Sequence, residues 1–253
     1  MTVTPQATVH SGRLAVFNLT VARITARALF GRRRFLLLLP LPLLLFGLAV
    51  LAQSLGAAPH DWVPAVVVNL GLNVVLPVIA LVVGTGVLGS EIDDGTLAHI
   101  LAKPLSRSQI VLSKLVVAIV VTAVTVCVPL LAVGYVAHSP SLGWGLVVGG
   151  LVGSAAYCSL FVALSLLTRR PVLVGLAYVL LWENLLSNFL SGTRVLSIQQ
   201  YTLEVADRVS GSDLISGNVS LAVALSMAFI FVAGATVLAI DRLRSFSVVG
   251  ETS

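Results

Sequence analysis

Charged side chains are scarce in this chain. Only 10% of its 253 residues are Asp, Glu, Lys or Arg, whereas a typical soluble domain is about 25% charged. Hydrophobic residues make up 58% of the sequence, and a soluble globule could not hide that much apolar surface. The composition therefore predicts a membrane protein.

Residue patterns typical of catalytic, nucleotide-binding or metal-binding sites are also absent from the sequence. Lys103 and Lys114 are the only lysines, and no G-x-x-x-x-G-K-[ST] phosphate loop occurs, so any ATP hydrolysis must take place on another polypeptide. Cys127 and Cys158 form no C-x-x-C pair. The four histidines lack the i, i+4 spacing of a helical zinc site; they are His10, His60, His99 and His138. We expect no catalytic residue, metal site or cofactor on this chain.

Long apolar runs dominate the rest of the sequence. A membrane core of about 30 Å needs roughly 20 apolar residues of helix, and the chain offers this length six times. The predicted fold is an all-α membrane protein whose spans lie near residues 35–54, 64–88, 113–136, 142–167, 172–190 and 219–240. The fifth span is unusual because it contains the carboxylate of Glu183.

The distribution of Lys and Arg predicts the orientation of these spans. With a cytoplasmic N-terminus, thirteen basic residues lie on the inner side and only Arg194 and Arg208 lie on the outer side, as the positive-inside rule requires. The inner residues are Arg13, Arg23, Arg27, Arg32, Arg33, Arg34, Lys103, Arg107, Lys114, Arg169, Arg170, Arg242 and Arg244. The net charge of +5 therefore reflects topology, with both termini in the cytoplasm, and not binding of nucleic acid.

The N-terminal region has an amphipathic pattern. After a tail of residues 1–12, apolar residues recur at helical spacing from residue 14 to residue 28, while Arg23 and Arg27 project from the opposite face. This pattern predicts a helix over residues 13–33, either in the plane of the lipid headgroups or against a soluble partner. The arginines at 32–34 favour the membrane surface.

The segment between the second and third spans is the most polar in the chain. Its acidic start is followed by Gly95 and by Thr96, which can cap a short helix that ends before Lys103-Pro104. Ser106 has the position of an N-cap for the next helix, with Gln109 at the capping-box position. The segment is either a charged connector or a docking element for a soluble protein.

The order of residues in this segment resembles that in the permeases of type-2 ABC exporters. In that family the first cytoplasmic loop carries Glu, then Gly-Thr-Leu, then Pro-x-Ser-Arg and a Lys at the start of the third span. The matching residues here are Glu91, Gly95-Thr96-Leu97, Pro104-Leu105-Ser106-Arg107 and Lys114. The likeness extends to an N-terminal elbow helix, six spans and an enlarged outer segment, residues 191–218.

The resemblance implies a function for the polar segment. Loop 91–107 would be the coupling helix that docks into a separate ATPase subunit, which would bind ATP and Mg²⁺. The implied docking residues are Glu91, Asp93, Asp94, Gly95, Thr96, Leu97, Lys103, Pro104 and Arg107. We expect a second contact at Arg169 and Arg170, export as the direction, and a path enclosed by two copies or by one copy and a related subunit in the bacterial inner membrane.

Polar groups inside the spans are candidates for the substrate path. Glu183 either lines this path or accepts hydrogen bonds from a folded-back outer segment. Asn69 and Asn73 share a helix face and either line the path or join helices. Gly145, Gly149 and Gly153 form a small-x-x-x-small ladder that predicts close helix packing.

Two other classes of protein fit the same topology. An ion-coupled secondary transporter would need intramembrane charges and often shows inverted repeats, whereas this chain has one intramembrane carboxylate and no clear repeat. A membrane scaffold would transport nothing. The sequence does not identify a substrate.

Overall fold

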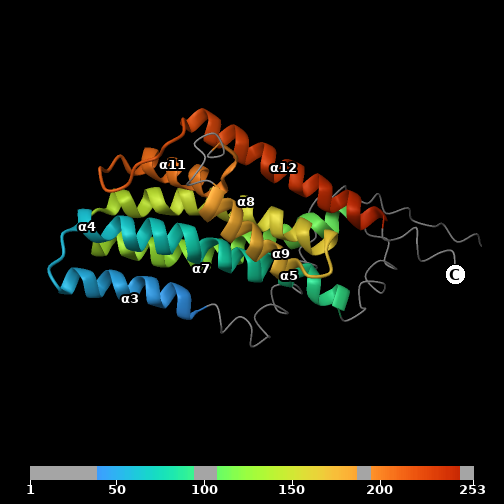
Figure 1. The fold of residues 1–253 in the computed structure, drawn as a ribbon, viewed down its shortest axis with the longest axis horizontal. Coiled ribbons are helices and arrows are strands. Elements are labelled where there is room, and N and C mark those ends of the chain that lie inside the picture. Colours follow the sequence, from blue (N-terminus) through green and yellow to red (C-terminus); the bar gives the residue numbers. More distant parts are fainter. Residues whose placement is uncertain (1–38, 94–106, 187–194, 246–253) are drawn as a thin grey trace, which may run out of the picture.

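The computed structural model describes residues 39–93, 107–186 and 195–245. Within these ranges the chain forms helices joined by short connections, with no β-strand. The helices make an elongated bundle whose axes run mostly along the length of the molecule (Figure 1). The predicted tail 1–12, the predicted helix 13–33 and the predicted short helix after Thr96 lie outside the described residues.

The helices begin where the sequence supplies suitable residues. Proline occupies the first turn of α3, α4, α8 and α9, where its missing N–H costs no hydrogen bond. Pro64, the first residue of η1, instead lies inside the continuous helix Pro59–Leu88, where it removes one backbone donor. In chain order the elements are α3 (Pro40–Ser54), α4 (Pro59–Val63), the π-helix η1 (Pro64–Val75), α5 (Leu76–Asp93), α7 (Arg107–Val136), α8 (Pro140–Leu167), α9 (Pro171–Ala177), the π-helix η2 (Tyr178–Leu186), α11 (Ile198–Ser210) and α12 (Leu221–Ser245).

The described part of each predicted span is mainly helical. Among the described residues, four helices are long and apolar enough to cross a membrane: Pro59–Leu88, Arg107–Val136, Pro140–Leu167 and Leu221–Leu243. The helices of the first and fifth predicted spans are shorter, Pro40–Ser54 and Pro171–Asn184. At about 1.5 Å per residue, the 15 residues of α3 reach roughly 22 Å, less than the thickness of a membrane core.

Two π-helices interrupt the second and fifth spans, and the sequence analysis did not predict them. In η1 the backbone N–H of Leu76 bonds to the carbonyl of Gly71, the i−5 pattern of a π-helix. Pro77 has no N–H for the carbonyl of Asn73, which disturbs the α-helical ladder where η1 ends. In η2 the side-chain amide of Asn184 donates to the carbonyl of Val179 at 2.9 Å.

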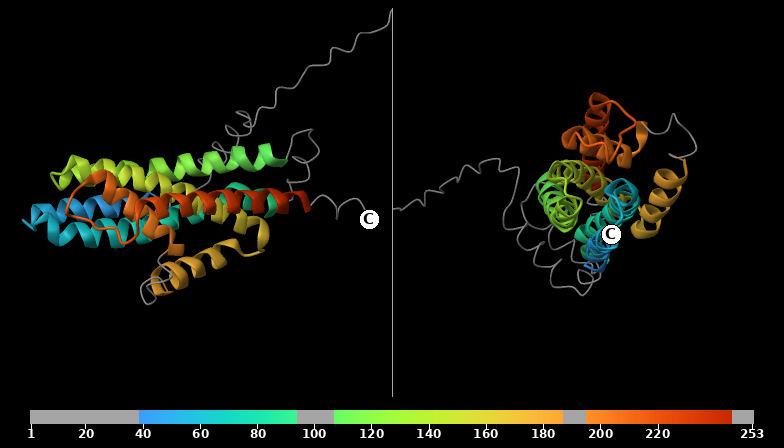
Figure 2. Two further views of the ribbon diagram at one scale, coloured as in Figure 1. Left: turned by 90° about the horizontal axis from the view of Figure 1, so that it is seen from above. Right: turned by 90° about the vertical axis from the view of Figure 1, so that its left-hand side faces the viewer.

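Helix α8 is the centre of the bundle. It packs against α5, α7, α11 and α12, and Leu142, Leu146, Tyr157 and Phe161 of α8 are fully buried. The pair α9–η2 lies to one side of the bundle (Figure 2), where α9 packs against α5 and α8. Helices α3, α7 and α12 expose apolar side chains on the outside, among them Leu43 at 65% and Phe229 at 74%.

The two ends of the bundle differ in charge. At one end α5 and α12 terminate, α7 begins, and the turn 168–170 joins α8 to α9; we call this the Arg107 end (Figure 1). The opposite end, where α4 and the C-terminus of α11 lie, is the α4 end. Every described Lys and Arg except Arg208 lies in a helix or in the turn 168–170 at the Arg107 end, which agrees with the predicted separation of charge.

Candidate functional site

The helices that flank the polar loop are joined to each other at the Arg107 end. Lys114 of α7 is only 1% exposed, and its Nζ donates a hydrogen bond to the carbonyl of Val87 in α5 at 3.1 Å. Arg107, the first residue of α7, donates from Nη1 to the carbonyl of Leu243 in α12 at 3.2 Å. These two bonds connect the start of α7 to both α5 and α12.

The predicted docking residues are described only in part. Arg107 starts α7, where the capping position of Ser106 predicts a helix start, and Glu91 and Asp93 lie in the last turn of α5. The other predicted docking residues, Asp94, Gly95, Thr96, Leu97, Lys103 and Pro104, lie outside the described residues. Arg169 and Arg170 are exposed at the same end, in a turn where the backbone N–H of Arg170 donates to Thr168 Oγ1 at 3.0 Å.

Asn69 and Asn73 differ in their surroundings although both lie on η1. Asn69 is exposed. Asn73 is partly buried, and its Oδ1 is a buried atom with no hydrogen-bond partner among the described residues. The structure therefore does not bring both side chains to one buried polar site.

Glu183 is buried at 1% exposure and is surrounded by hydrogen-bond donors. Its Oε1 accepts from the hydroxyl of Tyr178 and from the backbone N–H of Ile198, both at 3.0 Å. Its Oε2 accepts from the hydroxyl of Ser197 and from the backbone N–H of Gln199 at 3.5 Å. Three of these donors belong to the segment that follows the fifth span, so the observed contacts are those of a carboxylate bound by a folded-back outer segment.

Other buried polar atoms near the start of α11 make no hydrogen bond of standard geometry to a described residue. The hydroxyl of Tyr157 is one of them; it is fully buried close to the carboxylate of Glu183. Ser154 Oγ, one turn away on α8, and Gln200 Oε1, in the first turn of α11, are also buried without a partner among the described residues. Such groups destabilise a structure relative to one in which they are hydrogen-bonded.

The predicted glycine ladder is confirmed as a packing surface, and its partner is α11. A Cβ added to Gly145 would lie 2.4 Å from the carbonyl oxygen of Ala206, and one added to Gly149 would lie 2.5 Å from that of Thr202. A Cβ on Gly153 would lie 2.5 Å from Thr202 Oγ1. Only glycine allows α11 to approach the backbone of α8 this closely.

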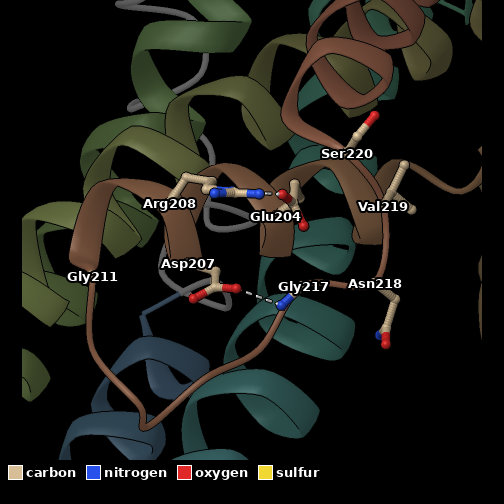
Figure 3. Close-up of a pocket in the computed structure, with 8 residues that line it drawn as sticks. All are labelled: Glu204, Asp207, Arg208, Gly211, Gly217, Asn218, Val219 and Ser220. Atoms are coloured by element: carbon tan, nitrogen blue, oxygen red, sulfur yellow. Dashed lines mark hydrogen bonds and ion pairs between the residues drawn. The ribbon is translucent and has the colours of Figure 1, made fainter.

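A recess opens at the α4 end where α11 ends and α12 begins (Figure 3). Its volume is about 520 Å³. Asp207 accepts a hydrogen bond from the backbone N–H of Gly217 at 2.7 Å, and Arg208 Nε contacts Glu204 Oε1 at 3.2 Å. The lining residues are Glu204, Asp207, Arg208, Gly211, Gly217, Asn218, Val219 and Ser220. Its charged side chains are therefore already bonded within the segment 204–217.

The sequence analysis treated residues 191–218 only as an enlarged outer segment and missed α11. Signals for this helix are present in the sequence. Ser197 is an N-cap whose side chain accepts from the N–H of Gln200, and Gly211 ends the helix in the left-handed conformation at φ 56°. Small residues recur four apart at positions 202, 206 and 210, the same spacing as the glycines of α8.

The apolar exterior, the four long apolar helices and the buried polar groups define a multi-pass membrane protein. Residues 32–192 match the model of a family described as ABC-2 family transporter protein, and the chain belongs to this family. The match confirms the resemblance stated from the sequence. Permeases of this family act in transmembrane transport and typically lack an ATPase domain. No curated protein matches the chain.

Proposed function

We propose that this chain is the permease subunit of an ATP-driven exporter in a bacterial inner membrane. The observation that carries the proposal is the family match over residues 32–192, which includes the patterned loop 91–107. The absence of a phosphate loop from the sequence supports a separate ATPase subunit that binds ATP and Mg²⁺.

Six crossings with both termini in the cytoplasm account best for the charges and the helix directions. The Arg107 end then faces the cytoplasm, and the α4 end faces outward. The two shorter helices, α3 and α9–η2, adjoin residues 35–38 and 187–190 of the predicted spans, which would extend them to membrane length. Residues 13–33 would form the elbow helix at the cytoplasmic surface.

Loop 91–107 is the proposed coupling helix. It joins α5 to α7, and both helices are long and continuous at the Arg107 end. Closure of the ATPase on nucleotide would push this loop, and the bonds of Lys114 and Arg107 would pass the movement to α5 and α12. Arg169 and Arg170 are exposed at the same end of the bundle and would supply the second cytoplasmic contact.

The translocation path would lie between two copies of this chain, or between this chain and a related subunit. Asn69 is exposed on η1, and we keep it, with Asn73 and Glu183, as a candidate for the lining of this path. The exposed apolar faces of α3, α7 and α12 would contact lipid or the second subunit.

Co-purification tests this function. The tagged chain, extracted from its native membrane in mild detergent, is expected to retain a polypeptide that hydrolyses MgATP. Glu91→Ala and a deletion of residues 93–97 should each abolish this retained activity, because both change the proposed docking element. Asp61→Ala is the matched control, since Asp61 is an exposed carboxylate in α4 at the opposite end.

Three outcomes would count against the proposal. Loss of the ATPase from Asp61→Ala as well would mean that the loop has no special role. Transport by the purified chain alone would favour the ion-coupled secondary transporter. Absence of any ATPase, together with absence of transport, would favour the membrane scaffold.

A further inference from the structure

Helix α11 begins inside the bundle and ends at its α4 end. Gly145 lies near the start of α8 and meets Ala206 and Ser210, whereas Gly153 lies at the middle of α8 and meets Thr202. The two helices are therefore antiparallel, and Ile198, four residues before Thr202, lies about 6 Å deeper still. The N-terminus of α11 is buried near the middle of the longest helices.

A buried helix N-terminus needs acceptors for its free N–H groups and favours a negative charge, because the helix dipole is positive there. Glu183 supplies both. Its carboxylate receives two backbone N–H groups of α11 and the hydroxyl of the N-cap Ser197. The described Lys and Arg residues lie toward the two ends of the bundle, so the groups that bind the carboxyl group of Glu183 are the start of α11 and the hydroxyls.

The remainder of α11 buries polar side chains as well as apolar ones. Gln199, Gln200, Thr202 and Glu204 are all buried on α11, a polar composition for a helix inside the bundle. Gln200 Oε1, with Ser154 Oγ and Tyr157 Oη of α8, makes no hydrogen bond of standard geometry to a described residue in this arrangement. These atoms would gain hydrogen bonds if water reached them, so they favour an arrangement in which α11 has withdrawn.

We propose that Glu183 is a positioning residue that latches α11 into the outer half of the bundle, and that release of this latch lets α11 withdraw toward the α4 end. In the transporter proposed above, the latched α11 closes the outer side of the path; that role rests on the proposed function, whereas the latch does not. The family match ends at residue 192, before α11 begins.

Two tyrosines at one carboxylate provide a matched pair of variants. Tyr178 donates a hydrogen bond to Glu183 at 3.0 Å, whereas the hydroxyl of Tyr157 lies close to the same carboxylate but makes no bond of standard geometry to it. Tyr178→Phe and Tyr157→Phe each remove one hydroxyl and no carbon atom. If Glu183 holds α11 in place, the first change should weaken this hold more than the second, whereas a general sensitivity to polar changes in the core would affect both variants equally.

Accessibility of the start of α11 is the measurement. A cysteine replaces Gln200, which is 7% exposed, in a chain that carries Cys127→Ala and Cys158→Ala. Whole cells are labelled from outside with a membrane-impermeant maleimide, and the labelling rate is compared between variants of equal protein level and equal elution volume. Glu183→Gln should raise the rate about tenfold or more, the factor that corresponds to about 1.4 kcal/mol.

Tyr178→Phe should raise the rate by a smaller factor, and Tyr157→Phe should raise it less than Tyr178→Phe does. Glu204→Gln is a further control, because Glu204 is a buried carboxylate of α11 whose Oε1 bonds to Arg208 of the same helix. This variant should leave the labelling rate unchanged.

Unchanged labelling in both Glu183→Gln and Tyr178→Phe overturns the latch, as does an equal increase in both tyrosine variants. If Glu183→Gln does not fold, the tyrosine pair decides alone. Labelling needs no ATPase, so the latch and the proposed function fail separately.

Discussion

The two ends of the bundle are held together by different kinds of contact. At the Arg107 end, long side chains reach from α7 to backbone carbonyls of α5 and α12. At the α4 end, α11 lies directly on the glycine backbone of α8. Long side chains can follow small movements of their acceptors, whereas backbone packing at glycine either fits or separates. The first arrangement suits an end that receives movement, and the second suits an end that switches between two positions.

The largest effect is expected where backbone meets backbone. Gly149→Leu would place a branched side chain where a Cβ alone already lies 2.5 Å from the carbonyl oxygen of Thr202. We expect it to displace α11 and to cost about 3 kcal/mol of folding free energy, at the upper end of the usual range for overpacking. The measurement is the apparent Tm of the purified protein in detergent.

Gly234→Leu in α12 is the control for this substitution. A Cβ at Gly234 would have nothing within 4 Å, and replacement of a helical glycine there should raise stability by up to about 1 kcal/mol. A similar loss of Tm in both variants would show that glycine replacement, and not the contact with α11, causes the effect.

The second expected effect is at the Arg107 end. Lys114→Met keeps most of the apolar stem of the side chain but removes the donor to the buried carbonyl of Val87. The expected loss is about 1–3 kcal/mol, the usual cost of depriving a buried acceptor of its partner. Arg170→Met, at an exposed position of the same end, should leave the apparent Tm unchanged. Equal values for Lys114→Met and the parent would mean that this end is not held by the lysine.

Most of the helices could be predicted from the sequence, because long apolar runs with basic flanks are typical of membrane-spanning helices. The predicted spans 113–136 and 142–167 lie within α7 and α8, and the glycine ladder predicted close packing. The partner of the ladder could not be predicted, since α11 is polar and short and carries no membrane signal. Its position depends on Glu183 and Ser197, which lie 14 residues apart and meet only when the chain folds back.

A third, smaller effect is expected at the N-cap of α11. Ser197 accepts from the N–H of Gln200 and donates to Glu183, so Ser197→Ala should cost about 1 kcal/mol, the typical value for loss of an N-cap. Ser226→Ala is the comparison, because Ser226 is exposed and bonds only within its own helix α12. A shift in Tm for Ser226→Ala as large as that for Ser197→Ala would contradict this assignment.

The smallest expected effects come from replacing one arginine at each end of the bundle, Arg208 and Arg107. Arg208 is 63% exposed and bonds to Glu204 one turn away on the same helix, so Arg208→Gln should cost about 0.5 kcal/mol or less. Arg107 instead bonds to Leu243 of another helix, 136 residues further along the chain, and Arg107→Gln should lower the free energy of unfolding by about 1 kcal/mol, the usual value for one hydrogen bond.

The dependence of these two losses on salt concentration distinguishes them further. The effect of Arg208→Gln should vanish in about 1 M NaCl, where the Debye length is about 3 Å, whereas the bond from Arg107 to a neutral carbonyl should persist. If both effects respond equally to salt, the contrast between a screened surface pair at the α4 end and an interhelical bond at the Arg107 end is wrong.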